Sequence, residues 1–254
     1  MNYSRNNMSN KKWQIVVPED FESTNQNYRI NGKQYPRVTA TLGIIAKHRV
    51  DAWIKRIGHA KANQILETRQ AIGVHMHKLI ELTLKGEDCN LGGYELEIQE
   101  GMCKFYEFQQ TASLKPDGLE QRLWSNKYGY AGTADFVGTY QSPPKIKTPK
   151  GVLQSPFLVR GRKPVFEKPA YVIGDWKTGK GFYPTYWLQL AAYAMAFKEL
   201  TGIQVEGAFI ARIRDGKLKV AEMTWSELEL EFEAYIHALS LYEWQHKLGK
   251  YSKN

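Results

Sequence analysis

The hydrophobic periodicity of this 254-residue chain changes from helical to strand-like after residue 112, and this change limits the folds it can adopt. Before that point apolar residues recur at helical spacing, and after it short apolar runs lie between turn residues. The expected helices are 60–84, 93–112, 183–200 and 224–248, and the expected strands are 119–126, 129–140, 171–176, 205–214 and 217–223. This order predicts an α/β fold with a central mixed β-sheet flanked by helices.

The N-terminal part contains weaker signals. Residues 1–12 are polar and rich in asparagine, which predicts disorder, and residues 13–254 are expected to form a single domain. Residues 13–17 could form a short strand or a docking segment. An Asn-Gly pair within residues 28–35 predicts a tight hairpin. Residues 37–58 predict one broken helix or two short ones, with Thr39 as the N-cap.

The C-terminal part has clearer signals for turns and caps. Asp215-Gly216 between two apolar runs predicts a hairpin turn. Thr224 and Glu227 have the spacing of a capping box, so we expect the last helix to begin at this point. Gly249 is expected to follow its end.

Composition favours a polyanionic partner. The chain carries 35 Lys and Arg residues against 26 Asp and Glu, a net charge of +9, which favours nucleic acid over an anionic membrane. Two cysteines are too few for a disulfide framework or a four-cysteine iron–sulfur or zinc site. There is no run of 18 apolar residues and no export signal. We therefore expect a cytoplasmic protein of a bacterial or phage-infected cell, with no membrane partner.

Residues 141–169 interrupt the pattern with prolines and basic residues. Seven basic residues against the single acid Glu167 give this segment +6 of the net charge of +9. We interpret it as a basic insert, a protruding hairpin or arm with a strand at 151–159, although a solvated loop is the simpler alternative. The residues expected to bind nucleic acid are Lys145, Lys147, Lys150, Arg160, Arg162 and Lys163 in this insert, and Lys180 beyond it.

A strand at 171–176 ends in Asp175-Trp176-Lys177. Because side chains alternate between the two faces of a strand, Asp175 and Lys177 point the same way and Trp176 points to the other face. A carboxylate and an ammonium group at a strand end can hold a metal ion and position a water molecule. Without supporting residues, a solvated ion pair at the strand end is the simpler interpretation of this pair.

Further polar residues extend this candidate site. Asp135 and Glu120 lie on expected neighbouring strands, and two such carboxylates could share Mg²⁺, which prefers hard oxygen ligands. His77 lies on the helix at 60–84, with His75 as an alternative. Each residue also has an ordinary explanation, as a surface carboxylate or as a core or surface histidine.

Gln189 and Tyr193 lie four residues apart, so they share one face of the helix that follows the Asp-x-Lys strand. An ordinary amphipathic helix would produce the same spacing.

In order and spacing, these residues resemble the RecB-like branch of the PD-(D/E)XK nuclease superfamily. The chain is similar to the members that include the mitochondrial genome maintenance exonuclease and the CRISPR adaptation nucleases. Residues 36–42 also resemble the Pro-x-Val-Thr start of exonuclease members. The matching residues are Gly73, His77, Glu81, Glu120, Gly132–Asp135, Asp175–Lys180 and Gln189–Tyr193.

The resemblance implies a restriction-endonuclease-like fold whose helical N-terminal half arches over the site. The sequence departs from the family pattern in two respects. The basic insert lengthens the interval between Asp135 and Asp175. The cysteine cluster that holds an iron–sulfur cluster in some relatives is absent, so no such cluster is expected.

The resemblance also implies one or two Mg²⁺ or Mn²⁺ ions. Asp135 and Asp175 would be the principal ligands, helped by the carbonyl of Trp176. His77 would hold a second ion, and Glu120 would be a further ligand or would orient one.

By the same resemblance, Lys177 would orient or deprotonate the attacking water, and Gln189 and Tyr193 would position Lys177 and the phosphate. The expected activity is that of a metal-dependent DNA exonuclease acting on single-stranded DNA or DNA ends, in repair, recombination or phage DNA metabolism. A structure-specific endonuclease and a non-catalytic DNA-binding module are the alternatives. Recombination or replication proteins are possible partners, and the polarity of digestion stays open.

Overall fold

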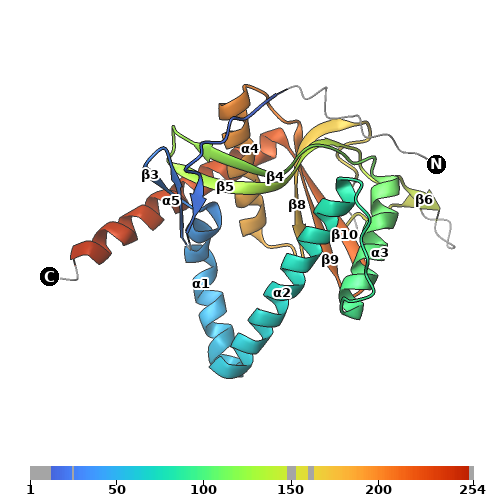
Figure 1. The fold of residues 1–254 in the computed structure, drawn as a ribbon, viewed down its shortest axis with the longest axis horizontal. Coiled ribbons are helices and arrows are strands. Elements are labelled where there is room, and N and C mark those ends of the chain that lie inside the picture. The colour runs from blue at the N-terminus through green and yellow to red at the C-terminus, as the bar shows by residue number, and fades with distance from the viewer. Residues whose placement is uncertain (1–12, 25, 148–152, 160–162, 252–254) are drawn as a thin grey trace.

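The computed structural model describes residues 13–24, 26–147, 153–159 and 163–251. Its centre is a mixed five-stranded sheet with helices on both faces, as the sequence predicts (Figure 1). The helices are α1 (Val38–Ile57), α2 (His59–Leu84), α3 (Leu96–Thr111), α4 (Pro184–Thr201) and α5 (Trp225–Tyr251). The strands of the central sheet are β4 (Lys115–Ser125), β5 (Tyr130–Tyr140), β8 (Ala170–Lys177), β9 (Gly207–Arg214) and β10 (Lys217–Thr224).

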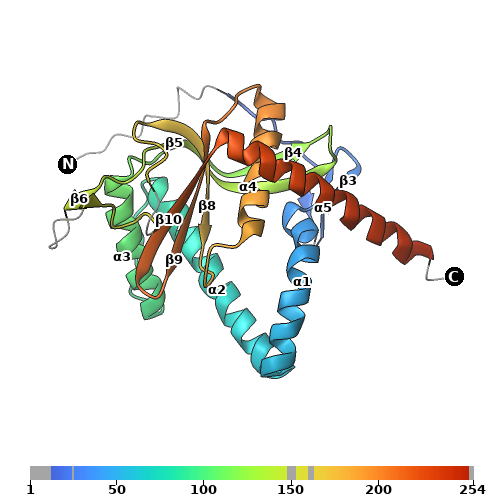
Figure 2. The same cartoon turned by 180° about the vertical axis from the view of Figure 1, so that it is seen from behind.

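The strand order is β10-β9-β8-β5-β4. Only β8 and β9 run parallel, and the other neighbours are antiparallel. Alternation along β8 places Ile173 in a core with α4 and α5, and Val172 in a second core with α2 and α3. The sheet is therefore covered on both faces (Figure 2).

The N-terminal part forms a small sheet of β1 (Glu22–Ser23), β2 (Asn27–Ile30) and β3 (Lys33–Pro36). The expected hairpin at 28–35 is confirmed by β2 and β3. Its buried residues pack on Trp124 and Ala131 of β4 and β5. Residues 13–17 form no strand, but Trp13 docks by packing edge-on against Phe197, with ring centroids 5.0 Å apart.

Helices α1 and α2 form a V-shaped hairpin whose tip lies away from the sheet (Figures 1 and 2). Gly58, with φ of 87°, separates the two arms. The prediction of a broken or doubled helix before residue 58 is wrong, because α1 is continuous. Thr39 is not its N-cap either: α1 begins at Val38, and Arg37 precedes it without a side-chain capping bond.

Several element boundaries also differ from the prediction. Helix α3 begins at Leu96 rather than 93, after a turn, and β4 begins at Lys115, four residues early. The capping box at the start of α5 is confirmed by a hydrogen bond from the backbone N–H of Thr224 to Glu227 Oε2 (2.7 Å). Gly249 does not end α5, which extends to Tyr251.

The basic insert is anchored to the sheet rather than wholly protruding. Backbone hydrogen bonds from Val159 N–H to the Val220 carbonyl (2.9 Å) and from Val220 N–H to the Phe157 carbonyl (2.7 Å) join it to β10. Phe157 and Phe166 are buried in the core beneath it. Of the strand expected at 151–159, residues 151 and 152 lie outside the described residues, and only β7 (Leu153–Gln154) is a strand, paired with β6 (Ile146–Lys147).

A buried carboxylate strengthens this anchor. Glu222 on β10 accepts hydrogen bonds from the Tyr140 hydroxyl and from the backbone N–H of Val165, the latter at 2.8 Å. Because Tyr140 ends β5 and Val165 lies in the insert, one side chain ties the insert to two strands.

Candidate active site

The candidate site lies where β5 and β8 separate. Their pairing ends at Phe136 and Gly174, and the next position on each strand is occupied by Asp135 and Asp175. Beyond that point, the backbone N–H of Trp176 donates to Asp135 Oδ2 (2.9 Å) instead of to a strand carbonyl. Where the ladder ends, two carboxylates therefore occupy facing positions on neighbouring strands.

Asp175 belongs to a buried hydrogen-bonded chain. Lys177 Nζ lies 2.6 Å from Asp175 Oδ2 and donates to Gln189 Oε1 (3.1 Å). Gln189 Nε2 in turn lies 3.2 Å from Asp175 Oδ1 and 3.3 Å from the Tyr193 hydroxyl. Through Gln189, helix α4 therefore contacts both members of the strand-end pair.

Trp176 contributes in another way. Its indole lies on the opposite face of the sheet, packed against Phe105 and Phe209 with ring centroids 5.4 Å from each. Gly174 makes this packing possible, because a Cβ there would lie 2.4 Å from the Phe209 ring. The aromatic core thus fixes the strand that carries Asp175 and Lys177.

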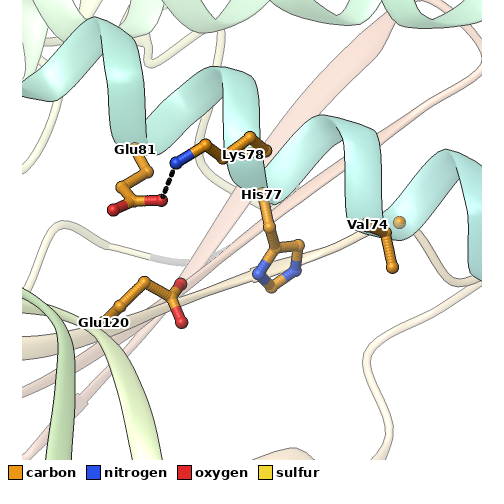
Figure 3. A pocket seen from close by; sticks show the side chains of 6 residues that line it. Val74, His77, Lys78, Glu81 and Glu120 are labelled. Atoms are coloured by element: carbon orange, nitrogen blue, oxygen red, sulfur yellow. Dashed lines mark hydrogen bonds and ion pairs between the residues drawn. The ribbon is translucent and has the colours of Figure 1, made fainter.

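The second group of residues consists of His77, Glu120 and Asp135. One potential ligand atom from each lies within 4.8 Å of the others. His77 Nδ1 is 3.4 Å from Asp135 Oδ2. Figure 3 shows His77 on α2 and Glu120 on β4 directed into the same space. The β4–β5 hairpin and the more distant helix α2 therefore together supply a set of potential metal ligands.

The backbone of Glu120 is unusual. Its φ is 47°, in the left-handed region, although it lies within β4. The neighbouring pairs, Leu119 with Phe136 and Gln121 with Ala134, place Glu120 opposite Asp135. A left-handed backbone conformation is energetically unfavourable for a residue other than glycine. Residues held in this conformation often lie at functional sites.

The charges of the site perturb one another. Burial disfavours ionised Asp135, yet His77 and then Lys177 outweigh it and hold the pKa of this carboxyl below its usual value. Burial also opposes charge on His77, but Asp135 and Asp175 raise its pKa to about 9. Lys177 has a raised pKa despite burial, because it faces Asp175 and Asp135. The two cationic side chains are therefore protonated at neutral pH.

The other two carboxyls are harder to ionise. Burial, with a smaller contribution from Asp135, raises the pKa of Asp175 to about 6, although Lys177 opposes the shift. Burial of its carboxylate and the charge of Asp135 raise the pKa of Glu120 to about 7, even though the residue as a whole is exposed. Burial and the repulsion between neighbouring carboxylates therefore oppose full ionisation of the site, and a bound cation would relieve both.

These residues fit a divalent cation. Asp175 Oδ2 is buried and has no hydrogen bond of good geometry among the described residues, only the close ion-pair contact with Lys177. Asp135, Glu120 and His77 add carboxylate oxygens and an imidazole nitrogen nearby. Mg²⁺ prefers carboxylate and water oxygens, and Mn²⁺ also accepts imidazole.

Two cavities meet at Glu120. The larger, about 450 Å³ and open, is lined by Gly73, Val74, His77, Lys78, Glu81 and Glu120 (Figure 3). The smaller, about 170 Å³ and more enclosed, is lined by Tyr28, Arg37, Val38, Thr39, Glu120, Gly132, Thr133, Asp135, Gln189 and Tyr193. The first turn of α1 therefore borders one cavity and the C-terminal half of α2 borders the other, so the site lies at the open end of the V-shaped hairpin.

The basic insert lies apart from this centre. It leaves β5 at Tyr140 and joins β8 at Ala170, five positions from Asp175 and thus roughly 17 Å away along the strand. Lys145 and Lys163 are exposed. Lys147 lies in β6, and residues Lys150, Arg160 and Arg162 lie outside the described part of the chain. Lys180 is exposed in the loop after β8, three positions from Lys177.

The sequence analysis missed two sets of residues. Arg212 and Arg214 on β9 donate to the carbonyls of Gly179 and Thr178, at 3.4 and 3.2 Å, and so hold the loop after Lys177. Arg37 lines the smaller cavity. No local pattern marks these arginines: Arg212 and Arg214 bind carbonyls 33 and 36 positions away, and Arg37 meets the distant Glu120 and Asp135 only through the fold.

Comparisons with known proteins add no assignment: no protein-family model and no curated protein matches the chain. Among the helices of the described segments, none combines the length and apolar character needed to cross a membrane.

Proposed function

We propose that this protein is a Mg²⁺- or Mn²⁺-dependent nuclease that hydrolyses phosphodiester bonds of single-stranded DNA or of DNA ends. The observation that carries the proposal is the convergence, where β5 and β8 separate, of a His–Glu–Asp ligand set and a buried Asp–Lys pair. With the mixed sheet, it supports membership in the RecB-like PD-(D/E)XK superfamily and a restriction-endonuclease-like fold.

Asp135, Asp175 and Glu120, with His77, would hold the cation. When bound, the cation supplies Lewis-acid stabilisation of the phosphoryl oxygens and a hydroxide nucleophile near neutral pH. The carboxylate of Asp135 remains ionised because of its neighbours, so it is available as a ligand. His77 and Glu120 must first lose their protons.

Lys177 acts as a cation rather than as a base. Its raised pKa keeps the ammonium group protonated, so it can donate to the attacking water and to a phosphate oxygen that gains negative charge. Gln189 fixes this ammonium group through its side-chain carbonyl. Gln189 is itself held by Tyr193, so the pair orients Lys177 rather than reacting.

Substrate attraction comes from the charge of the protein. A net charge of +9 favours a polyanion through release of counterions, and the affinity should fall with salt. The exposed Lys180 and the insert residues Lys145 and Lys163 are the described basic residues that we propose contact the DNA backbone.

The test is degradation of labelled single-stranded DNA with Mg²⁺ or Mn²⁺, compared with EDTA. Asp175→Asn and Lys177→Met should lower the rate by about 10²–10³-fold or more, as expected when a preorganised charge is removed from a reacting centre. The matched controls are Asp215→Asn and Lys217→Met, which change exposed residues at the β9–β10 turn. They should retain wild-type rates.

Circular dichroism and thermal melts would show that each variant is folded. Wild-type rates in both site variants would show that the site is wrongly assigned. DNA binding without cleavage of single-stranded, duplex or flap DNA by the wild-type protein would favour a non-catalytic module instead.

A further inference from the structure

The smaller cavity has two chemically different walls. One consists of the acidic centre, with Asp135 and Glu120. The other presents the guanidinium group of Arg37 and hydroxyl groups, and it contains no carboxylate. The hydroxyl residues of this wall are Tyr28 and Thr39, and the Tyr28 hydroxyl lies 3.4 Å from that of Thr133, two positions before Asp135 on β5. A wall of donors beside a cation site is suited to an anionic oxygen ligand.

Arg37 is held firmly with donors to spare. Its guanidinium group donates to the Thr24 carbonyl (3.0 Å) and the Tyr28 hydroxyl (3.4 Å). It also lies over the Tyr28 ring, 5.0 Å from the centroid. A guanidinium group has five N–H donors, so contacts with the described residues use only part of its capacity. Arg37 is thus preorganised at the cavity without being saturated.

The start of α1 adds to the same wall. Val38 and Thr39 are its first two residues and both line the cavity. The first-turn N–H groups have no intrahelical acceptor, no side chain caps them, and this turn contains no acidic residue. The positive end of the helix dipole therefore reinforces the charge of Arg37.

The shape of the cavity limits what can enter. It is smaller and more enclosed than the neighbouring cavity, which it meets at Glu120. A strand that lies in the open cavity and reaches the acidic centre would continue into this more enclosed space beside Tyr28 of β2 and the first turn of α1. Such a space accommodates the end of a strand better than a continuing one.

We infer that the Arg37 cavity binds the terminal phosphate of a nucleic-acid strand whose adjacent phosphodiester bond lies at the acidic centre. This inference rests on the proposed nuclease function and gives it a preference for phosphorylated ends. A 5′-phosphate and a 3′-phosphate present the same chemistry, and the experiment distinguishes them. An internal phosphate of a continuous strand is the competing occupant.

The experiment uses three single-stranded oligonucleotides of one sequence, with a 5′-phosphate, a 3′-phosphate or hydroxyl groups at both ends. Binding is measured by fluorescence anisotropy in EDTA, where no hydrolysis occurs, and cleavage is measured with Mn²⁺. One phosphorylated end should bind and react about 10- to 100-fold better than the hydroxyl ends, the range of a charged hydrogen bond.

Two variants at the cavity should abolish this preference. Arg37→Gln removes the charge. Thr39→Glu places a repelling carboxylate at the first turn of α1, where an acid is favourable for the helix and folding is retained. In both, the ratio between phosphorylated and hydroxyl ends should fall to near one. The matched control is Arg29→Gln, which removes one arginine charge from β2; Arg29 is exposed and does not line the cavity, so the preference should persist.

Equal binding and cleavage of all three wild-type substrates would overturn the inference while leaving the nuclease proposal intact. A preference that survives in both cavity variants would also overturn it. If Arg37→Gln weakens every substrate equally, the cavity holds an internal phosphate. Absence of metal-dependent cleavage on any substrate would instead contradict the proposed function, and the EDTA binding ratio would still test the cavity.

Discussion

Gly132→Ala would test whether the packing of α4 on β5 positions the catalytic groups. A Cβ at Gly132 would lie 2.3 Å from Tyr193 Cε1 and 2.9 Å from its hydroxyl oxygen. Carbon atoms in contact are about 3.5–4.0 Å apart, so the ring would have to retreat by roughly 1.2 Å. Tyr193 is only 3% exposed, so its surroundings must move with it.

The cost follows from this displacement. Adding a methyl group to a packed core typically lowers the free energy of unfolding by about 1–3 kcal/mol, and a protein of this size loses about 2–4 °C in Tm per kcal/mol. The 3.3 Å contact between the Tyr193 hydroxyl and Gln189 would break, which releases the side chain that holds Lys177. A misplacement of about 1 Å near a reacting centre can lower kcat by about 100-fold.

Urea denaturation and single-turnover DNA cleavage would measure the two effects. Gly43→Ala is the matched control, because a Cβ there meets open space in the interior of α1; it should stabilise the protein by about 0.5–1 kcal/mol. Tyr193→Phe removes the hydroxyl without moving the ring, and so separates loss of the hydrogen bond from displacement. Wild-type stability and activity in Gly132→Ala would refute the reasoning.

Three further predictions concern the cation, the insert and the charge. His77 has a pKa of about 9 and Glu120 of about 7, so Mn²⁺ must displace their protons when it binds. The Kd of Mn²⁺ should therefore fall as the pH rises from 6 to 9, by up to about tenfold per pH unit for each proton displaced. Calorimetry in two buffers of different ionisation enthalpy would detect the protons released at pH 7, and a pH-independent Kd would contradict this. Glu222→Gln removes one of the two acceptor oxygens that hold the insert. It should lower the free energy of unfolding by about 1–3 kcal/mol and make the insert more accessible to trypsin. Glu229→Gln, at an exposed position, is the control and should have neither effect. Neutralising the six basic insert residues predicted to bind DNA should weaken DNA binding. The slope of the logarithm of the binding constant against log[salt] should become shallower by roughly 0.7 for each phosphate of a single strand that the protein no longer neutralises. An unchanged slope would show that the insert does not touch DNA.

Local patterns in the sequence determined most of the elements. Periodicity predicted α2, α4 and α5 closely, and the Asn-Gly and Asp-Gly pairs predicted both hairpins. Element ends were less accurate because local signals compete with tertiary packing. Thr39 resembles an N-cap, yet α1 begins before it, since the backbone of Arg37 is bound to Gln26 and bridged to Ala131.

Local geometry predicted only that Asp175 and Lys177 share one face of a strand and that Gln189 and Tyr193 share one face of a helix. Their selection as site residues depended on the order and spacing that resemble a nuclease family. What only the tertiary structure decided is how these local units meet. The ladder between β5 and β8 ends where Asp135 and Asp175 face each other, Glu120 adopts a left-handed conformation opposite Asp135, and α2 brings in His77. The cavity at Arg37 and the anchoring of the insert by Glu222 likewise join residues that are distant in sequence, and no local pattern encodes such contacts.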